Sequence, residues 1–189
     1  MSAECQLNLP PRTMDDADER VAAPLKAAHD KLGFVPNMYT GMANLPPLLQ
    51  TYLDGYDRFR SECGLSPQEQ EVVFLTISRR NGCGYCMAAH STIADKMSGV
   101  PEPVTDALRE GHPLPDDRLE ALRQFTDIMV ETRGHPGHDD LQAFLDAGYR
   151  EADVLAIILA IAVKTLSNFS NHVLRPEVDE LFRERQWTT

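Results

Sequence analysis

Apolar residues recur through most of this chain at the three- and four-residue spacing of amphipathic α-helices. Residues 66–69, Ser-Pro-Gln-Glu, form a capping box with proline at the first helical position, which predicts a helix that runs to Arg80. Asn81 and Gly82 interrupt it, and another helix is expected from about Cys83 to about 98–99. No segment alternates apolar and polar residues convincingly with a period of two. We therefore predict an all-α protein built as a helical bundle.

Helices are expected along most of the remaining sequence as well. Gly33 is placed to end the first helix and Asn44 to cap the third, whereas residues 1–14 are expected to be irregular. The other predicted helices cover 15–32, a short stretch after 34–39, a stretch beginning at 44, 101–110, 116–133, 138–147, 151–169 and 176–185. A capped helix, a break and a further helix occur at 66–98 and again at 151–185, a faint echo that is consistent with a duplicated helical unit.

The size and charge of the chain indicate how many domains it has and which partners it can bind. Its 189 residues suit a single domain over 1–189 with one hydrophobic core. An excess of 29 Asp and Glu over 18 Lys and Arg gives a net charge of −11, which repels phosphate backbones and anionic lipid. We expect neither nucleic acid nor a membrane as a partner. The N-terminus lacks a secretory pattern and the apolar run 154–163 is too short to cross a bilayer, so a cytoplasmic location is expected.

The most informative chemistry lies at the start of the helix that begins near Cys83. Cys83, Cys86 and His90 stand at i, i+3 and i+7, so they share one helix face. In a reducing compartment such a cysteine pair is typical of a catalytic or metal-binding site. A thiol at a helix start is acidified by the helix dipole, and His90 is a candidate base for Cys86. The pattern predicts thiol redox chemistry, while Cys5 and Cys63 are expected to be inert.

Glu71 lies twelve residues before Cys83, in the middle of the preceding helix. Two consecutive helices joined by a short break pack antiparallel, so this carboxylate is able to face His90 and orient its ring. A surface glutamate is the alternative and is what the pattern alone favours. The apolar neighbours at 72–74 nevertheless indicate a partly buried position.

Glu71 and the Cys83-x-x-Cys86-x-x-x-His90 motif, on a small acidic helical chain, resemble the alkylhydroperoxidase D branch of the carboxymuconolactone decarboxylase-like family. The segments 34–37 and 168–172 look like features of its peroxidase-related subgroup, and the resemblance covers roughly residues 30–175. It implies an alkylhydroperoxidase D-like helical bundle that assembles as a homo-oligomer, as a dimer, trimer or hexamer, with active sites near subunit boundaries. It also implies that Cys86 is the peroxidatic cysteine, Cys83 the resolving one, and Glu71 with His90 a proton relay.

The reaction that the resemblance implies needs no cofactor. The Cys86 thiolate attacks hydrogen peroxide or an alkyl hydroperoxide and becomes a sulfenic acid, which condenses with Cys83 to a disulfide. A dithiol reductant, a lipoyl-type protein or another small redox protein, then restores the thiols. In the best-known family pattern a histidine precedes the second cysteine, and here Tyr85 takes that position. Tyr85 is therefore a candidate hydrogen-bond donor to bound peroxide. His172 is a second candidate contact, for which a capping or buried polar role is the simpler interpretation.

Three other functions fit parts of the pattern. A zinc site would use Cys83, Cys86 and His90, and residues 135–138 offer a His-x-x-His, but a metal-binding cysteine pair usually lies on a knuckle rather than along one helix, so we expect no metal. A carboxymuconolactone decarboxylase-like enzyme would not need the cysteine pair. A non-enzymatic redox sensor would need only the disulfide. A thioredoxin-like fold is excluded by the missing strand before Cys83.

Overall fold

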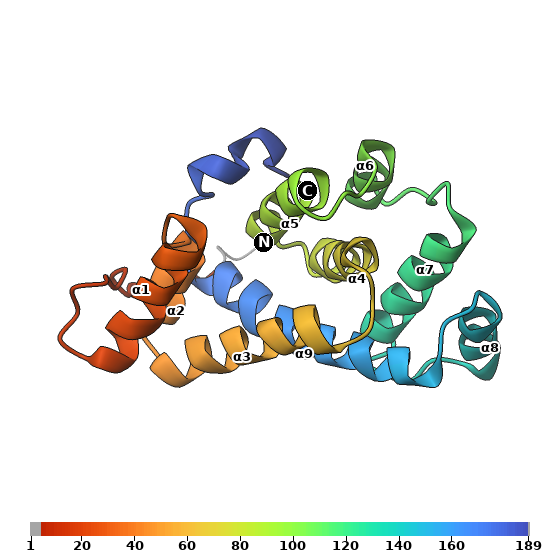
Figure 1. The fold of residues 1–189 in the computed structure, drawn as a ribbon, viewed down its shortest axis with the longest axis horizontal. Helices are drawn as coiled ribbons and strands as arrows, with labels where there is room; N and C mark the ends of the chain where they lie inside the picture. Colours follow the sequence, from red (N-terminus) through yellow and green to blue (C-terminus); the bar gives the residue numbers. More distant parts are fainter. Residues whose placement is uncertain (1–4, 189) are drawn as a thin grey trace.

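The computed structural model describes residues 5–188, and this part of the chain is helical and without strands (Figure 1). The all-α prediction is confirmed. The helices are α1 Glu19–Leu32, α2 Asn37–Met42, α3 Pro46–Glu62, α4 Pro67–Arg80, α5 Gly84–Lys96, α6 Glu102–Glu110, α7 Asp117–Glu131, α8 His138–Asp146 and α9 Glu151–Leu174, followed by the 3-10 helix η1 Glu180–Arg185.

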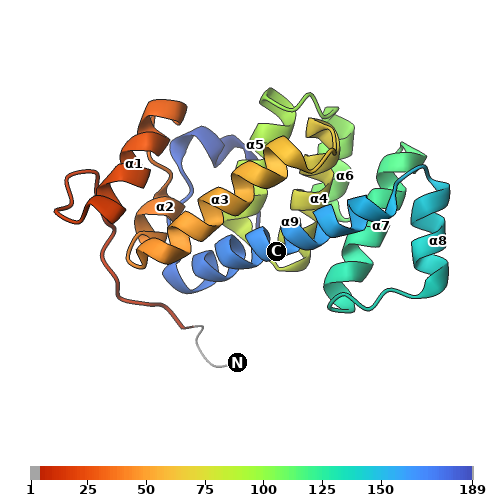
Figure 2. The ribbon, with the colours of Figure 1, turned by 60° about the horizontal axis from the view of Figure 1, so that its bottom comes forward.

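Helix α4 lies at the centre of the core (Figure 1). Every residue from Glu69 to Ser78 is buried, because α5, α6, α7 and α9 pack around it. Helices α3 and α9 pack against each other across one side of the bundle (Figure 2). The α4–α5 pair that contains the candidate chemistry is therefore enclosed by helices from both ends of the sequence.

Local sequence signals set several helix ends as expected. The Ser66 hydroxyl accepts a hydrogen bond from the Glu69 amide, and the Glu69 carboxylate accepts one from the Ser66 amide, so the predicted capping box is confirmed. Asp116 caps α7 by accepting from the Leu119 amide at 2.8 Å. Gly33 ends α1 at φ 81°, a conformation that glycine adopts without steric cost.

Other helix ends were predicted wrongly. Helix α1 begins at Glu19 rather than at residue 15, because Asp18 is the residue that caps it. Asn44 does not cap α3; Leu45 takes that position, and the Asn44 amide donates to the carbonyl oxygens of Pro10 and Gly41. The described part of the lead-in, from residue 5 onward, contains no helix, whereas residues 1–4 lie outside the described part of the chain.

The C-terminal region differs most from its prediction. Helix α9 continues to Leu174 instead of ending at Phe169, since no helix-breaking residue occurs before Pro176. Arg175, at φ 50°, then turns the chain out of the helix. Of the predicted helix at 176–185, the structure has the 3-10 helix η1. The two segments of the suggested repeat therefore differ: 66–98 contains the α-helices α4 and α5, whereas 151–185 contains the long helix α9 and η1.

The uninterrupted apolar run 154–163 is too short to cross a membrane, but the whole of helix α9 is long and apolar enough by length and composition. Of its most apolar stretch, 44% is buried in the fold. A core helix passes the same test. The side chains of Asp153, Lys164 and Asn168 on α9 are buried among the other helices, which favours the core helix. Its opposite face exposes the apolar side chains Leu155, Ile158 and Phe169.

Candidate active site

The turn between α4 and α5 places the cysteine pair. Gly82 adopts φ 68° in this turn, and the Cys83 amide donates to the Ser78 carbonyl at 2.9 Å. Cys83 occupies the N-cap of α5, and Cys86 is the third residue of the helix. Both thiols thus lie within the first turn, where the helix dipole and free amide groups stabilise negative charge on sulfur.

Both cysteines are free thiols and almost completely buried, with 1% of Cys83 and 2% of Cys86 exposed. Helix α9 supplies the polar groups beside them. The Asn171 side-chain amide lies 3.6 Å from the Cys83 sulfur and 3.3 Å from the Cys86 sulfur. The Cys86 thiol also lies 3.9 Å from the Ser167 hydroxyl. The two sulfurs therefore converge on one amide group, which brings them together for disulfide exchange.

The two thiols are not equivalent. Cys83 donates a hydrogen bond to Cys86, and this bond together with burial raises the pKa of Cys83 well above its usual range. The same hydrogen bond lowers the pKa of Cys86 well below 9.0, and the nearby charge of Lys164 and the hydrogen bond with Ser167 act in the same direction against the effect of burial. Cys86 is consequently the thiol that ionises first, with Cys83 as its hydrogen-bond donor.

Behind Cys86, His90 contacts the carboxylate of Glu71. Nδ1 of His90 lies 2.9 Å from Oε2 of Glu71, and neither side chain is accessible to bulk water. The other carboxylate oxygen of Glu71 forms an ion pair with Arg60 and accepts a hydrogen bond from Ser98 at 3.4 Å. The expected approach of Glu71 to His90 is present, and the surface position that the pattern alone favours is wrong.

This arrangement defines the charge on each group. Burial raises the pKa of Glu71, but the hydrogen bonds with His90 and Arg60 and the charge of Arg60 outweigh it, so the pKa of Glu71 is lowered overall. Burial and the Lys164 charge lower the pKa of His90 more than Glu71 raises it. His90 is therefore a neutral imidazole at neutral pH. With its Nδ1–H donated to Glu71, the lone pair is left on Nε2, as a base requires.

The sequence analysis missed several members of the site. Arg60, from α3, completes the pair with Glu71 and packs over the ring of Phe74 at 4.8 Å. Lys164 and Ser167 come from α9 and lie on its buried side. Asn171 was noted only within a family-like segment. The one signal in the sequence is Lys164, a charged residue that directly follows the apolar run 154–163.

Tyr85 does not point a free hydroxyl toward the thiols. Its hydroxyl donates to the carboxylate of Asp179 and accepts from the Met38 amide at 3.4 Å, and 7% of the residue is exposed. Asp179 also accepts from the Asn37 amide at 3.1 Å. Tyr85 therefore holds two segments against α5: the residues before η1, through Asp179, and the start of α2, through Met38. Burial and the hydrogen bond to Asp179 raise the pKa of Tyr85 well above 10.0, so it is no base.

Tyr85→Phe is expected to lower the free energy of unfolding by about 1–3 kcal/mol, because the buried Asp179 carboxylate loses a hydrogen bond. Urea denaturation of Tyr85→Phe, Asp179→Asn and the double variant measures this coupling. The thiol chemistry of Tyr85→Phe should be retained at neutral pH. If the stability losses of the two single variants add up in the double variant, the two side chains do not interact. If Tyr85→Phe is as stable as wild type but its thiols no longer react, Tyr85 is a substrate contact after all.

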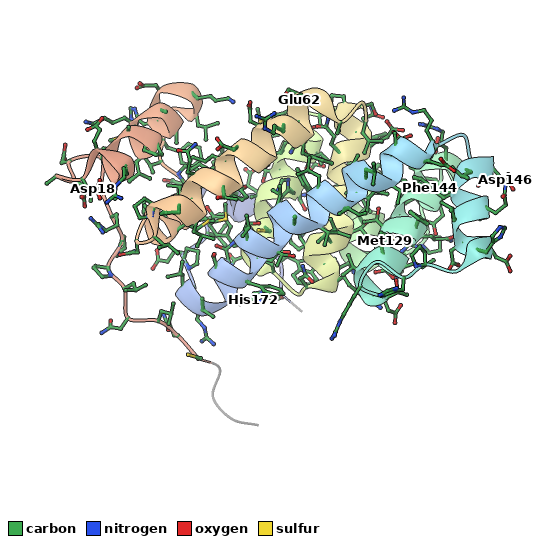
Figure 3. All side chains as sticks on the ribbon, turned by 90° about the horizontal axis from the view of Figure 1, so that it is seen from below. Asp18, Glu62, Met129, Phe144, Asp146 and His172 are labelled. Carbon is green, nitrogen blue, oxygen red and sulfur yellow. The ribbon has the colours of Figure 1, made fainter. Side chains whose placement is uncertain are left out.

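His172 lies near the C-terminal end of α9 (Figure 3) and is exposed, unlike its neighbour Asn171. Its ring stacks on Phe169, with ring centroids 6.1 Å apart. The expected capping or buried polar contact is wrong, because one helix position separates the buried amide of Asn171 from the solvent-facing imidazole. Asn171 rather than His172 connects this segment to the thiols.

The described residues contain no group of three or more His, Cys, Asp and Glu side chains arranged to hold a metal ion. His135 and His138, the alternative ligand pair, are both exposed. Cys5 is exposed, and Cys63 is partly buried with its sulfur 3.7 Å from the Gln70 amide. Neither cysteine lies among the groups that surround Cys83 and Cys86.

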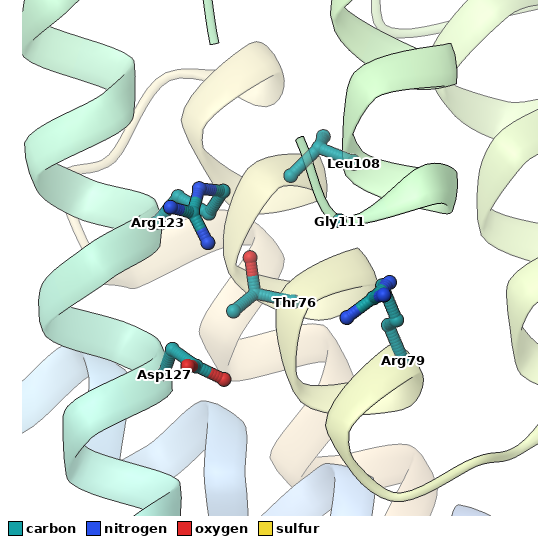
Figure 4. A pocket seen from close by; sticks show the side chains of 6 residues that line it. All are labelled: Thr76, Arg79, Leu108, Gly111, Arg123 and Asp127. Carbon is teal, nitrogen blue, oxygen red and sulfur yellow. The ribbon is translucent and has the colours of Figure 1, made fainter. Parts of the chain in front are cut away.

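Two hollows of the surface lie away from the thiols. A small polar cavity of about 120 Å³ between α4, α6 and α7 is bordered by two arginines (Figure 4). A larger groove of about 610 Å³ between α4, α7 and α9 is mainly apolar. Neither hollow is lined by Cys83, Cys86 or His90, and both sulfurs are almost completely buried.

The central part of the chain matches a known family. The sequence model of the carboxymuconolactone decarboxylase family matches residues 46–127, which include Glu71, Cys83, Cys86 and His90. Among curated proteins, no sequence matches this chain.

Solved structures extend the similarity over nearly the whole fold. A peroxidase-related protein from Ralstonia eutropha JMP134, described as an alkylhydroperoxidase AhpD core, has a TM-score of 0.81 and 22% identity, with 92% of this chain and 93% of that chain covered. A peroxidase-related protein from Silicibacter sp. TM1040 has a TM-score of 0.79 and 21% identity, covering 97% and 96%. The debrominase Bmp8, as a cysteine-to-alanine variant bound to 2,3,4-tribromopyrrole, has a TM-score of 0.77 and 17% identity, covering 96% and 97%.

At these identities the solved structures establish the fold, and the matched segment covers less than half of the chain. Residues 46–127 therefore resemble the carboxymuconolactone decarboxylase family, and the helices of this chain follow the alkylhydroperoxidase D-like arrangement.

Proposed function

We propose that this protein is a thiol-dependent peroxidase that reduces hydrogen peroxide or an alkyl hydroperoxide through Cys86 and Cys83. The observation that supports this most is the inequality of two adjacent thiols. Cys83 donates to Cys86 and Asn171 contacts both sulfurs, so the pKa of Cys86 is lowered while that of Cys83 is raised. One cysteine is thereby prepared as a nucleophile and the other as a protonated resolving thiol.

The first step oxidises Cys86. Its thiol proton passes to Nε2 of His90, and the thiolate attacks the distal oxygen of the peroxide, so that the O–O bond breaks as the S–O bond forms. The leaving oxygen takes the proton from His90 and departs as alcohol or water, and Cys86 becomes a sulfenic acid. Glu71, held by Arg60, stabilises the imidazolium that forms transiently and fixes the orientation of the ring.

The second step forms the disulfide. The sulfur of Cys83 attacks the sulfur of the sulfenic acid, the S–O bond breaks, and the hydroxyl leaves as water with the Cys83 proton. The two electrons delivered to the peroxide are thus drawn from the thiol pair. A dithiol reductant returns them by exchange through a mixed disulfide. The burial of both sulfurs favours slender partners, such as a small hydroperoxide and the arm of a lipoyl-type or other small redox protein.

We also propose that the chain assembles as a homo-oligomer. The apolar side chains Leu155, Ile158 and Phe169 lie exposed on one face of α9. Exposure of an apolar face to water is unfavourable, so contact with a second copy of the chain would stabilise it. An acidic surface gives no reason to expect nucleic acid as a partner.

Consumption of cumene hydroperoxide with dihydrolipoamide as the reductant tests the proposed activity. Wild-type protein should turn over repeatedly, and thiol titration without reductant should show the loss of two thiols per chain. Cys5→Ser/Cys63→Ser protein is the matched control and should behave as wild type. The absence of hydroperoxide consumption would contradict the proposal, and the loss of two thiols without turnover would indicate a redox sensor instead.

The debrominase relative provides a specific alternative outcome. Bmp8 is a dehalogenating enzyme with the same fold, and removal of bromine from a bromopyrrole as bromide also takes two electrons that a thiol pair can supply. The same assay should therefore include 2,3,4-tribromopyrrole. Turnover of the bromopyrrole without turnover of hydroperoxide would replace the peroxidase proposal with a reductive dehalogenase.

A further inference from the structure

Lys164 is a buried cation without a polar partner. The residue lies on α9 at 0% exposure, and its ammonium group has no hydrogen-bond partner among the described residues. The ring of Phe74 lies beside it, with its centroid 5.3 Å from Nζ. A buried charge without a counter-charge is strongly unfavourable, so the structure requires a nearby anion.

The buried carboxylate of Glu71 is already engaged. Glu71 directs one oxygen to Nδ1 of His90 and the other to Arg60 and Ser98. The charge of Lys164 nevertheless acts on the cysteine pair, since it lowers the pKa of both Cys83 and Cys86. The charge of Lys164 acts on three titratable groups at α5, which are Cys83, Cys86 and His90. Next to His90 lie Tyr56 of α3 and Glu71 of α4, and Glu71 pairs with Arg60 of α3.

Position on the helix connects Lys164 to Cys86. Lys164, Ser167 and Asn171 follow one another at i, i+3 and i+7, so they form a single polar stripe on the buried side of α9. The last two contact the Cys86 sulfur at 3.9 and 3.3 Å. His90, on α5, is neutral and so carries no positive charge to balance the Cys86 thiolate. On the α9 stripe, Lys164 is the residue that carries a positive charge.

We propose that Lys164 is the counter-charge of the Cys86 thiolate, a positioning residue that favours the ionised form of this sulfur once its proton has passed to His90. The inference deepens the proposed function, because a peroxidatic cysteine reacts as the thiolate. It assigns separate tasks to two groups: Lys164 stabilises the negative charge on the sulfur, and His90 moves the proton. The ammonium transfers no proton and makes no bond during the reaction.

Titration of the Cys86 thiolate by its ultraviolet absorbance tests the proposal without any substrate. In a Cys5→Ser/Cys63→Ser background, Lys164→Met should raise the pKa of Cys86 so that the thiolate fraction near neutral pH falls about tenfold or more. Lys96→Met is the matched control, since Lys96 lies exposed on α5 and pairs with Glu184. An unchanged Cys86 titration in folded Lys164→Met, or an equal shift in Lys96→Met, would overturn the proposal.

A second measurement covers the outcome in which Lys164→Met fails to fold. Cys86→Ser removes the thiolate and leaves the ammonium unpaired, so at mildly alkaline pH it should be less stable than wild type, and adding Lys164→Met should recover stability. Cys86→Ser that is as stable as wild type would contradict the pairing. Because neither readout uses peroxide, a shifted titration without hydroperoxide turnover would retain the Lys164 assignment while the peroxidase proposal fails.

Discussion

Cys86→Ser is expected to abolish hydroperoxide consumption, with a loss of about a thousandfold or more, since no other group at the site is an ionised sulfur. Cys83→Ser should behave differently. Its Cys86 can still attack one peroxide molecule, but the sulfenic acid cannot be resolved within the chain. Rapid mixing with hydroperoxide should therefore give a single turnover per chain for Cys83→Ser and none for Cys86→Ser.

The order of the two cysteines is the part of the mechanism that this comparison tests. The prediction rests on the hydrogen bond from Cys83 to Cys86 and on the opposite pKa shifts of the two thiols. A single turnover in Cys86→Ser with none in Cys83→Ser would reverse the assignment. Trapping of the sulfenic acid with dimedone should label Cys86 in the Cys83→Ser protein. Labelling of Cys5 or Cys63 in its place would show that another thiol reacts.

Glu71→Gln is expected to lower the free energy of unfolding by about 3 kcal/mol or more, because Arg60 keeps its charge in the core and loses its counter-charge. The same variant should reduce hydroperoxide turnover by about a hundredfold, since the imidazolium of His90 is no longer stabilised. Urea denaturation and steady-state turnover measure the two effects separately. Glu62→Gln is the matched control: Glu62 pairs with Arg58 on the exposed surface, where loss of an ion pair costs at most about 1 kcal/mol.

The pH dependence of this stability difference follows from the lowered pKa of Glu71. Below its folded-state pKa the carboxyl is protonated in both the folded and the unfolded chain, and above the ordinary value of 4.5 it is ionised in both. The advantage of wild type over Glu71→Gln should be complete above about pH 4.5 and decline as the pH falls through the lowered folded-state pKa. A stability difference that grew on acidification would contradict the ion pairing of Glu71.

Much of the fold was predictable because its signals are local. The capping box at Ser66 and the glycine at 33 each set a helix end through atoms within four residues, and apolar periodicity shows which faces are buried. The helix that contains Cys83, Cys86 and His90 was found in the same way. The end of α9 was missed because Ser170 and Asn171 look like a loop, whereas packing against α5 keeps them helical.

The remainder of the site was not predictable from spacing. Arg60 lies eleven residues before Glu71, and Asn171 lies 85 residues after Cys86. Neither contact follows from a helix period, because each depends on how separate helices cross. Tyr85 illustrates the same limit: its neighbours in sequence are the reactive groups, yet its hydroxyl is directed to Asp179, 94 residues away.

The most direct test of the central claim is a mass measurement of the tryptic peptide 81–96, which contains Cys83 and Cys86, before and after one equivalent of hydroperoxide. The account predicts that this peptide loses two hydrogen atoms as its disulfide forms, that a dithiol restores them, and that Cys83→Ser protein gains an oxygen there instead. A peptide of unchanged mass after the peroxide has been consumed would contradict it.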